Sequence, residues 1–170
     1  MLSPRIETER LILRRYSEED IDTFYDIIHD QRLQKFITFP DLTKEQELEY
    51  IRDCISKVED DKCEKWSIVL KSSNKSIGNI SVNTVVKKHN YCDVGYVIQY
   101  NYWGNGYAAE ALKAVSDYLL DSGYYLVECT CNELNTQSSR VMEKAGFKKN
   151  GCIPNRRLNK NGTYSGVEYY

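Results

Sequence analysis

A strong net charge is missing from this sequence of 170 residues, in which 23 Lys and Arg stand against 25 Asp and Glu, for a formal net charge of −2. Proteins that bind nucleic acid usually present a strongly basic face, so we expect no nucleic-acid partner. The sequence also has no apolar run long enough to span a bilayer, and residues 1–7 hold no apolar signal core. We therefore expect a cytoplasmic protein with no membrane partner.

Histidine is scarce, and the cysteines are scattered. His29 and His89 are the only histidines. The one close cysteine pair, Cys129 and Cys131, lies on an apolar strand pattern in which both side chains face the same way. A metal site would need further Cys or His ligands nearby. The pattern favours free, reduced thiols and predicts no metal site. The cysteines are Cys54, Cys63, Cys92, Cys129, Cys131 and Cys152.

The chain also lacks repeats, low-complexity tracts and any stretch rich in Pro, Gly and Ser that would divide it. Its length suits one ordinary domain, and 41% hydrophobic with 28% charged residues is typical of globular proteins. We expect a single domain over residues 1–170. The segment 166–170 resembles an unfinished last strand, which leaves open whether the natural chain continues beyond Tyr170. The sequence does not decide between a monomer and a homodimer.

Periodicity and capping signals predict the elements of the first half. The run RLILRRY at residues 10–16 indicates a strand, and Ser17 with the acidic residues after it is a typical start for a helix reaching about His29. Residues 43–46 form a capping-box pattern for a second helix. Polar turns separate three further runs, which are typical of an antiparallel strand meander over 66–70, 77–86 and 91–98.

After Ile98 the pattern changes. A loop with two glycines leads to a helix with one apolar face, which ends near Gly123. We then expect a buried strand over 126–131, a short helix over 135–145, and a strand-like chain from Phe147 that turns back as a hairpin. The sum is an α+β fold with a mostly antiparallel sheet and one strand–helix–strand unit.

The loop Gly104-Asn105-Gly106 is typical of a phosphate site. Glycines let the chain turn tightly and present successive N–H groups to an anion, and the helix N-terminus adds its dipole. A plain capping turn is the alternative interpretation. With Ala109 the glycines also satisfy the G-x-G-x-x-A fingerprint of nicotinamide-cofactor proteins, and Glu128 lies where that fold places a ribose-binding acid. That fold, however, needs further parallel strand–helix repeats, which this chain lacks.

Three segments together resemble the GNAT superfamily of N-acetyltransferases and, within it, the ribosomal-protein N-terminal (alanine/serine) acetyltransferase branch. They are residues 93–98 (DVGYVI), 102–112 (YWGNGYAAEAL) and 135–147 (NTQSSRVMEKAGF), and they follow a similar opening at 8–14 (TERLILR). The resemblance covers essentially the whole chain. It implies a GNAT-like, mixed, mostly antiparallel sheet with flanking helices and a splayed central strand pair. It also implies acetyl-CoA as the acetyl donor.

The resemblance further implies which residues hold the donor. The strand 91–98 would carry a bulge at Gly95 and leave backbone groups free for the pantetheine arm. N–H groups near Val97 and Ile98 would polarise the thioester carbonyl, and the glycine loop would bind the pyrophosphate. The full cofactor-binding set implied in this way is Val97, Ile98, Gly104, Asn105, Gly106, Tyr107, Ala108, Asn135 and Ser138.

The chemistry requires a proton to leave the attacking ammonium, and a carboxylate acting through water can accept it. By resemblance this role falls to Asp93, which is shorter than the strand Glu of many relatives; an exposed polar strand residue is the alternative. Met142 stands where many relatives carry a Tyr that protonates the departing thiolate. The resemblance therefore gives that role to Ser138, with helix capping as the alternative. We interpret Glu110 as structural, in the first turn of its helix.

We expect direct acetyl transfer to a primary amine. The amine would enter past the first two helices and the segment 36–40, where Phe36 and Phe39 form either a substrate-side wall or core. The branch suggests a protein N-terminus as acceptor, and small-molecule amines remain an alternative. The rival hypothesis is a catalytically silent CoA- or acetyl-CoA-binding module that serves as a sensor or a partner-binding domain.

Overall fold

The computed structural model describes residues 3–36, 42–59 and 63–170. Within these residues, eight strands form one sheet in the order β1-β2-β3-β4-β5-β6-β8-β7. Neighbouring strands are antiparallel except β5 and β6, which run parallel because a helix connects them. The strands are β1 (Ile6–Glu7), β2 (Leu11–Arg15), β3 (Lys65–Leu70), β4 (Lys75–Val86), β5 (Tyr91–Ile98), β6 (Leu126–Asn132), β7 (Gly151–Leu158) and β8 (Tyr164–Tyr169).

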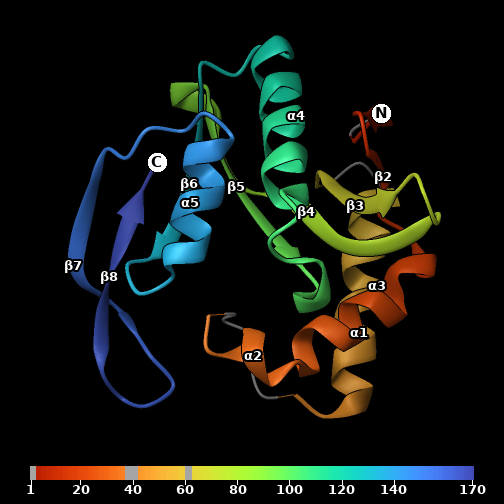
Figure 1. The fold of residues 1–170 in the computed structure, drawn as a ribbon, viewed down its shortest axis with the longest axis horizontal. Helices are drawn as coiled ribbons and strands as arrows, with labels where there is room; N and C mark the ends of the chain where they lie inside the picture. The colour runs from red at the N-terminus through yellow and green to blue at the C-terminus, as the bar shows by residue number, and fades with distance from the viewer. Residues whose placement is uncertain (1–2, 37–41, 60–62) are drawn as a thin grey trace.

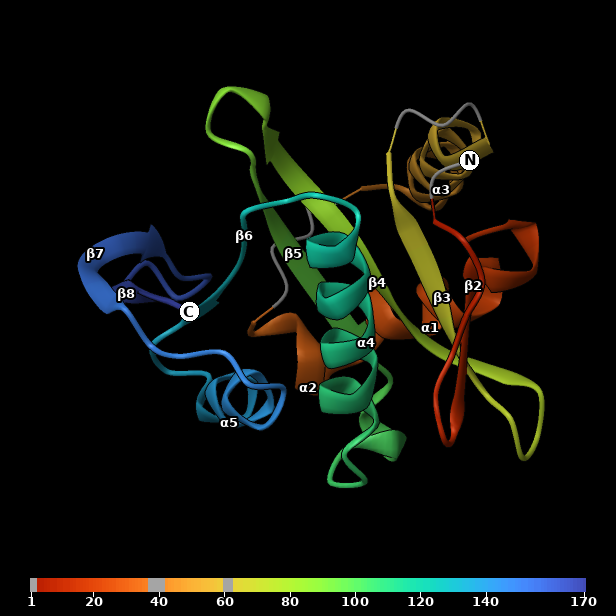
Figure 2. The same cartoon turned by 90° about the horizontal axis from the view of Figure 1, so that it is seen from above.

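The described residues also form five α-helices: α1 (Ile21–His29), α2 (Gln31–Gln34), α3 (Lys44–Glu59), α4 (Tyr107–Asp121) and α5 (Thr136–Lys144). Helices α4 and α5 lie on one face of the sheet, and α1 to α3 lie on the other (Figures 1 and 2). None of these helices combines the length and the apolar character that a membrane span needs.

Each face of the sheet has its own apolar cluster. The larger cluster packs under α4 and includes Trp66, Ile80 and Leu112, all fully buried. The smaller cluster joins α1 to α3 and includes Phe24 and Ile51. The two clusters follow from strand alternation, because successive side chains of a strand point to opposite faces of the sheet.

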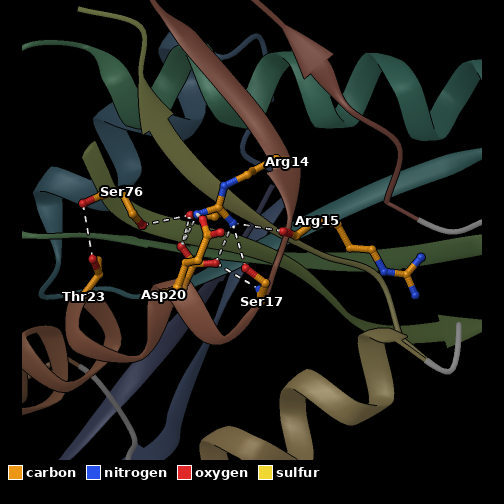
Figure 3. Close-up of polar contacts among 8 residues, drawn as sticks. Arg14, Arg15, Ser17, Asp20, Thr23 and Ser76 are labelled. Atoms are coloured by element: carbon orange, nitrogen blue, oxygen red, sulfur yellow. Dashed lines mark hydrogen bonds and ion pairs between the residues drawn. The ribbon is translucent and has the colours of Figure 1, made fainter. Parts of the chain in front are cut away.

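A buried polar network fixes α1 to its face of the sheet (Figure 3). The Asp20 carboxylate is 1% exposed and accepts hydrogen bonds from both terminal nitrogens of Arg14, at 2.8 and 3.0 Å. Ser67 Oγ donates to the same carboxylate at 2.6 Å and accepts from Ser76 Oγ at 2.8 Å. Thr23 Oγ1 in α1 donates to the Ser76 carbonyl. Strands β2, β3 and β4 are thereby linked to α1 through one carboxylate and its partners.

Strands β5 and β6 separate half-way along β5. They pair in register only from Tyr91↔Leu126 to Val94↔Cys129. Beyond that point residues 130–132 of β6 pair with β8, whereas residues 95–98 of β5 pair with β4 alone (Figure 2). The splayed central strand pair expected from the sequence is therefore present.

The predicted α+β fold is confirmed, and each predicted helix and strand is present with boundaries shifted by a few residues. The capping box at the start of α3 forms as predicted, since Thr43 N–H donates to Gln46 Oε1 at 2.9 Å and Gln46 N–H donates to Thr43 Oγ1 at 3.4 Å. The strand predicted from Phe147 onward is present as β7 but begins later, at Gly151. Strand β1 and helix α2 were not predicted.

The predicted bulge at Gly95 is wrong. The pairing of β4 with β5 shifts between Val82 and Thr84, so the extra residue, Asn83, belongs to β4. Glycine is needed on β5 for a different reason: an ideal Cβ at Gly95 would lie 2.6 Å from Asn83 Nδ2. The Asn83 side chain thus lies across Gly95, and any larger residue there would displace it.

Candidate active site

A cavity of about 430 Å³ lies where β5 and β6 separate. Its lining comes from both faces of the sheet: Leu33 and Asn79 belong to the α1 and α2 side, and Val141 belongs to the α5 side. The cavity therefore gives access to the end of β5 from two directions. Of the site residues predicted from the sequence, those that line it are Phe36, Val97, Ile98, Gly104, Gly106, Tyr107, Ala108, Asn135 and Ser138.

The glycine loop forms one end of this cavity. Gly104 has φ 80° and Gly106 has φ 81°, a region that favours glycine, and Gly106 is the N-cap residue of α4. Asn105, by contrast, does not line the cavity. Its side-chain amide donates to the carbonyls of Tyr102 and Trp103, both at 3.1 Å, so it holds the loop in shape.

Glu110 connects the glycine loop to the opening segment of the chain through hydrogen bonds, in agreement with the structural role predicted for it. It accepts hydrogen bonds from Thr8 Oγ1 at 2.6 Å and from Arg10 Nε at 2.7 Å, and Arg10 also donates to the Asn105 carbonyl at 2.9 Å. Although burial acts to raise it, these hydrogen bonds and the Arg10 charge hold the pKa of Glu110 below its usual value. The opening segment of the chain and the first turn of α4 thus form one unit.

The open edge of β5 presents backbone groups to the cavity. Gln99 N–H donates to the Ile77 carbonyl of β4, and because alternate residues of a strand point to opposite sides, the N–H of Ile98 points away from β4. The Ile98 carbonyl accepts a hydrogen bond from Trp103 Nε1 at 2.9 Å, which ties the loop to the strand end. Val97 is paired with Asn79 of β4 and also lines the cavity.

Asp93 lies beside the cavity rather than in its lining. Its Oδ1 accepts a hydrogen bond at 3.1 Å from Asn83 Nδ2, and Asn83 does line the cavity. Burial raises the pKa of Asp93, the Asn83 hydrogen bond lowers it, and the neighbouring Glu128 charge raises it, with a net upward shift. Glu128 sits directly opposite Asp93 in the parallel pair. A raised pKa brings a carboxylate closer to the range useful for a general base.

Ser138 lies across the gap from β5, in the first turn of α5. Its backbone N–H donates to Asn135 Oδ1 at 3.2 Å, so Asn135 caps α5 and lines the cavity at the same time. The Tyr96 hydroxyl lies 2.8 Å from Ser138 Oγ and 3.2 Å from the Ser138 carbonyl oxygen. Burial is the main cause of a strongly raised pKa of Tyr96, so its hydroxyl stays protonated.

Sequence reasoning missed Tyr96 and Asn79, both of which line the cavity. Tyr96 stands inside the quoted segment 93–98, and strand alternation places it on the face of the sheet shared with Val94. Strand alternation could therefore have indicated the face of the sheet to which the Tyr96 side chain points. Asn79 carries no comparable sequence signal. Of the two residues predicted for the acceptor side, Phe36 lines the cavity, and Phe39 lies outside the described residues.

Known proteins share this sequence pattern. Residues 10–148 match the family model described as "Acetyltransferase (GNAT) domain". The N-acetyltransferase YnaD of Bacillus subtilis is 30% identical over 154 residues, a stretch that covers 88% of each chain.

Solved structures share the fold. An acetyltransferase of the GNAT family from Bacillus anthracis matches with a TM-score of 0.84 and 24% identity, over 98% of this chain and 96% of that one. The ribosomal L7/L12 alpha-N-protein acetyltransferase RimL, solved in complex with coenzyme A, matches with a TM-score of 0.84 and 20% identity. This match also covers 98% of this chain and 96% of that one. The resemblance inferred from the three sequence segments is thereby confirmed.

Proposed function

Because the chain belongs to the GNAT acetyltransferase family and is an N-acetyltransferase, we propose that acetyl-CoA binds in the cavity at the end of β5 and that a primary amine is acetylated there. The observation that carries this proposal is the lining of the cavity by both faces of the sheet. A donor held from the α4 and α5 side and an acceptor entering from the α1 and α2 side can meet without a covalent enzyme intermediate.

The residues present suit this donor. Two glycines with positive φ stand at the N-terminus of α4, where N–H groups and the helix dipole favour a pyrophosphate. Residues 95–98 of β5 have no partner strand on the β6 side, which leaves an edge where the amide-containing pantetheine arm can pair. The cofactor-binding set proposed for this chain is the predicted one, with Asn105 acting through the shape of the loop.

Bound acetyl-CoA supplies an acetyl thioester, whose carbonyl carbon forms a new bond to the amine nitrogen while its bond to sulfur breaks. The N–H of Ile98 donates to the carbonyl oxygen as negative charge develops on it. Asp93 accepts, through a water, the proton that the amine loses. Ser138 donates its hydroxyl proton to the departing sulfur and regains a proton from water, Asp93 releases to water the proton that it accepted, and Tyr96 orients Ser138. Asp93 lies on the α1 and α2 side of the sheet, where the amine would enter. Ser138 lies on the α5 side, where the sulfur of the thioester would lie.

The acceptor is either a protein N-terminus or a small-molecule amine. The protein whose structure was solved with coenzyme A is named for acetylating the N-terminus of ribosomal L7/L12. That name supports the first alternative for this chain, while divergence of substrates among similar folds keeps the second.

The competing hypothesis is a CoA-binding module without turnover. The two are separated by measuring the dissociation constant of CoA by calorimetry and then the release of free thiol from acetyl-CoA with a panel of amines. We expect binding and amine-dependent thiol release. Tight binding without thiol release for any amine, basic and neutral peptides included, would support the binding module.

A further inference from the structure

Asn79 is a buried polar residue that points into the cavity. It is 6% exposed, stands in the centre of β4 and belongs to the lining. Within the described part of the chain its side-chain amide makes no hydrogen bond. The Asn79 amide is not among the fully enclosed polar atoms that lack a partner, so it is open to the cavity and available to hydrogen-bond a bound molecule.

The surroundings of Asn79 offer it no partner on its own face of the sheet. Its neighbour in β3, Ser67, donates its one hydroxyl proton to Asp20 and accepts from Ser76, so Ser67 has no proton left to donate to Asn79. Its neighbour in β5, Val97, is apolar. Further along β4, Ser81 Oγ donates to Asn83 Oδ1 at 2.9 Å. Among the described residues of this face, Asn79 is therefore a polar lining residue whose amide is left for a bound molecule.

No charged side chain is present among the described residues that line the cavity. Arg14, a cation on this face whose side chain is 25% exposed, is held by Asp20, and Asp93 lies behind Asn83. A carboxylate entering this space would lose its hydration without meeting a cation, and a second ammonium would meet no anion. A neutral polar group would meet neither penalty.

We infer that Asn79 determines acceptor specificity by hydrogen-bonding a neutral amide next to the reacting amine. The Asn79 amide offers both a donor and an acceptor, and an amide of the ligand offers the complementary pair, so the two can bond twice. A carboxylate cannot donate and an ammonium cannot accept, so each leaves one side of Asn79 unpaired. The inference rests on the proposed function, and it selects acceptors built like the start of a peptide chain over free amino acids and diamines.

The test compares three acceptors that share a primary amine: alaninamide, alanine and ethylenediamine. For the unmodified protein we expect kcat/KM for alaninamide to exceed that for the other two by at least about tenfold. In Asn79→Ala we expect kcat/KM for alaninamide to fall by about tenfold, through KM, while the values for alanine and ethylenediamine stay within about twofold. The KM for acetyl-CoA should not change.

Two further variants sharpen the test. Asn79→Asp places a carboxylate at the same position and should shift preference toward ethylenediamine. Thr84→Ala removes an exposed side chain from the same strand and should leave all three values unchanged. Equal use of alanine and alaninamide by the unmodified protein would overturn the inference, as would an equal loss for all three acceptors in Asn79→Ala. If no amine releases thiol, the proposed function itself fails.

Discussion

Asp93, near the start of β5, and Ser138, in α5, lie on opposite faces of the sheet, and the proposed mechanism gives each a distinct proton. Asp93 shares its face with Asn83 and Gly95, on the side of α1 and α2. Ser138 is reached from β5 by Tyr96, which points to the other face. A base beside the incoming amine and a proton donor beside the departing sulfur do not compete for the same space.

Asp93→Asn should lower kcat by about a hundredfold, because the amide cannot accept the proton. The raised pKa of Asp93 predicts the direction in which kcat depends on pH. Since only the ionised form acts as a base, kcat of the unmodified protein should fall as the pH decreases through the pKa of Asp93, and it should fall at a higher pH than an exposed aspartate would give. In the Asp93→Asn variant this fall should vanish from the pH profile of kcat.

Glu128→Gln is the matched control, because the Glu128 charge is one cause of the raised pKa of Asp93. Its removal should move the fall in kcat to lower pH and leave the plateau unchanged. A pH profile of Glu128→Gln identical to that of the unmodified protein would argue against Asp93 as the titrating group.

Ser138→Ala should lower kcat by about a hundredfold and raise the KM for acetyl-CoA by much less, because its main proposed role is to give a proton to the departing sulfur. Tyr96→Phe keeps the ring and removes the hydroxyl that lies 2.8 Å from Ser138 Oγ. If Tyr96 works through Ser138, the double variant should be no slower than Ser138→Ala. Independent, additive losses in kcat would contradict this arrangement.

The sequence was informative about residues whose role depends on local pattern. Gly104, Gly106 and Asn135 follow from spacing around helix starts, and the structure places all three in the cavity lining. Strand alternation could indicate the face of the sheet on which Tyr96 lies but not its contact with α5, and Asn79 was missed because its environment depends on contacts across elements. No local rule states that α5 crosses the open edge of β5, or that Ser67 is already occupied by Asp20.

At the scale of elements, the loop and the first turn of α4 should act as one rigid anion site. Gly106→Ala places a side chain at φ 81° and should lower the unfolding free energy by about 1–2 kcal/mol. It should also raise the dissociation constant of CoA by about tenfold, because the N–H groups at the helix start are displaced. Calorimetry with CoA and urea unfolding measure the two effects separately.

Gly123→Ala provides the comparison, since Gly123 also has positive φ, at 107°, and lies past the other end of the same helix. It should lower stability by a similar amount and leave CoA binding unchanged. If both variants weaken CoA binding equally, the effect comes from general destabilisation and not from the anion site.

Element prediction failed where tertiary contacts decide the structure. Helix α2 spans only Gln31–Gln34 and β1 only Ile6–Glu7, too short for periodicity to be recognised. Gly95 was correctly singled out as unusual, but its explanation was wrong. A glycine in a strand signals close approach or a bulge equally well, and only the neighbouring strand reveals that Asn83 carries the irregularity.

For the whole molecule, the Asp20 network should be the polar feature that matters most for stability, because it joins three strands to α1 (Figure 3). Asp20→Asn leaves Arg14 without its buried counter-ion and should lower the unfolding free energy by about 3 kcal/mol. Asp117→Asn, which breaks the exposed pair with Lys113, should change it by at most about 0.5 kcal/mol. Similar small values for both would show that the network does not hold α1 to the sheet.

The central claim is that acetyl-CoA and the amine occupy the two sides of one cavity at the same time and react directly. Initial rates of thiol release, measured while both substrates are varied, test this claim most directly. A ternary complex predicts double-reciprocal lines that intersect, together with one acetyl group found on the amine nitrogen for each thiol released. Parallel lines, or thiol release without an acetylated amine, would contradict the account.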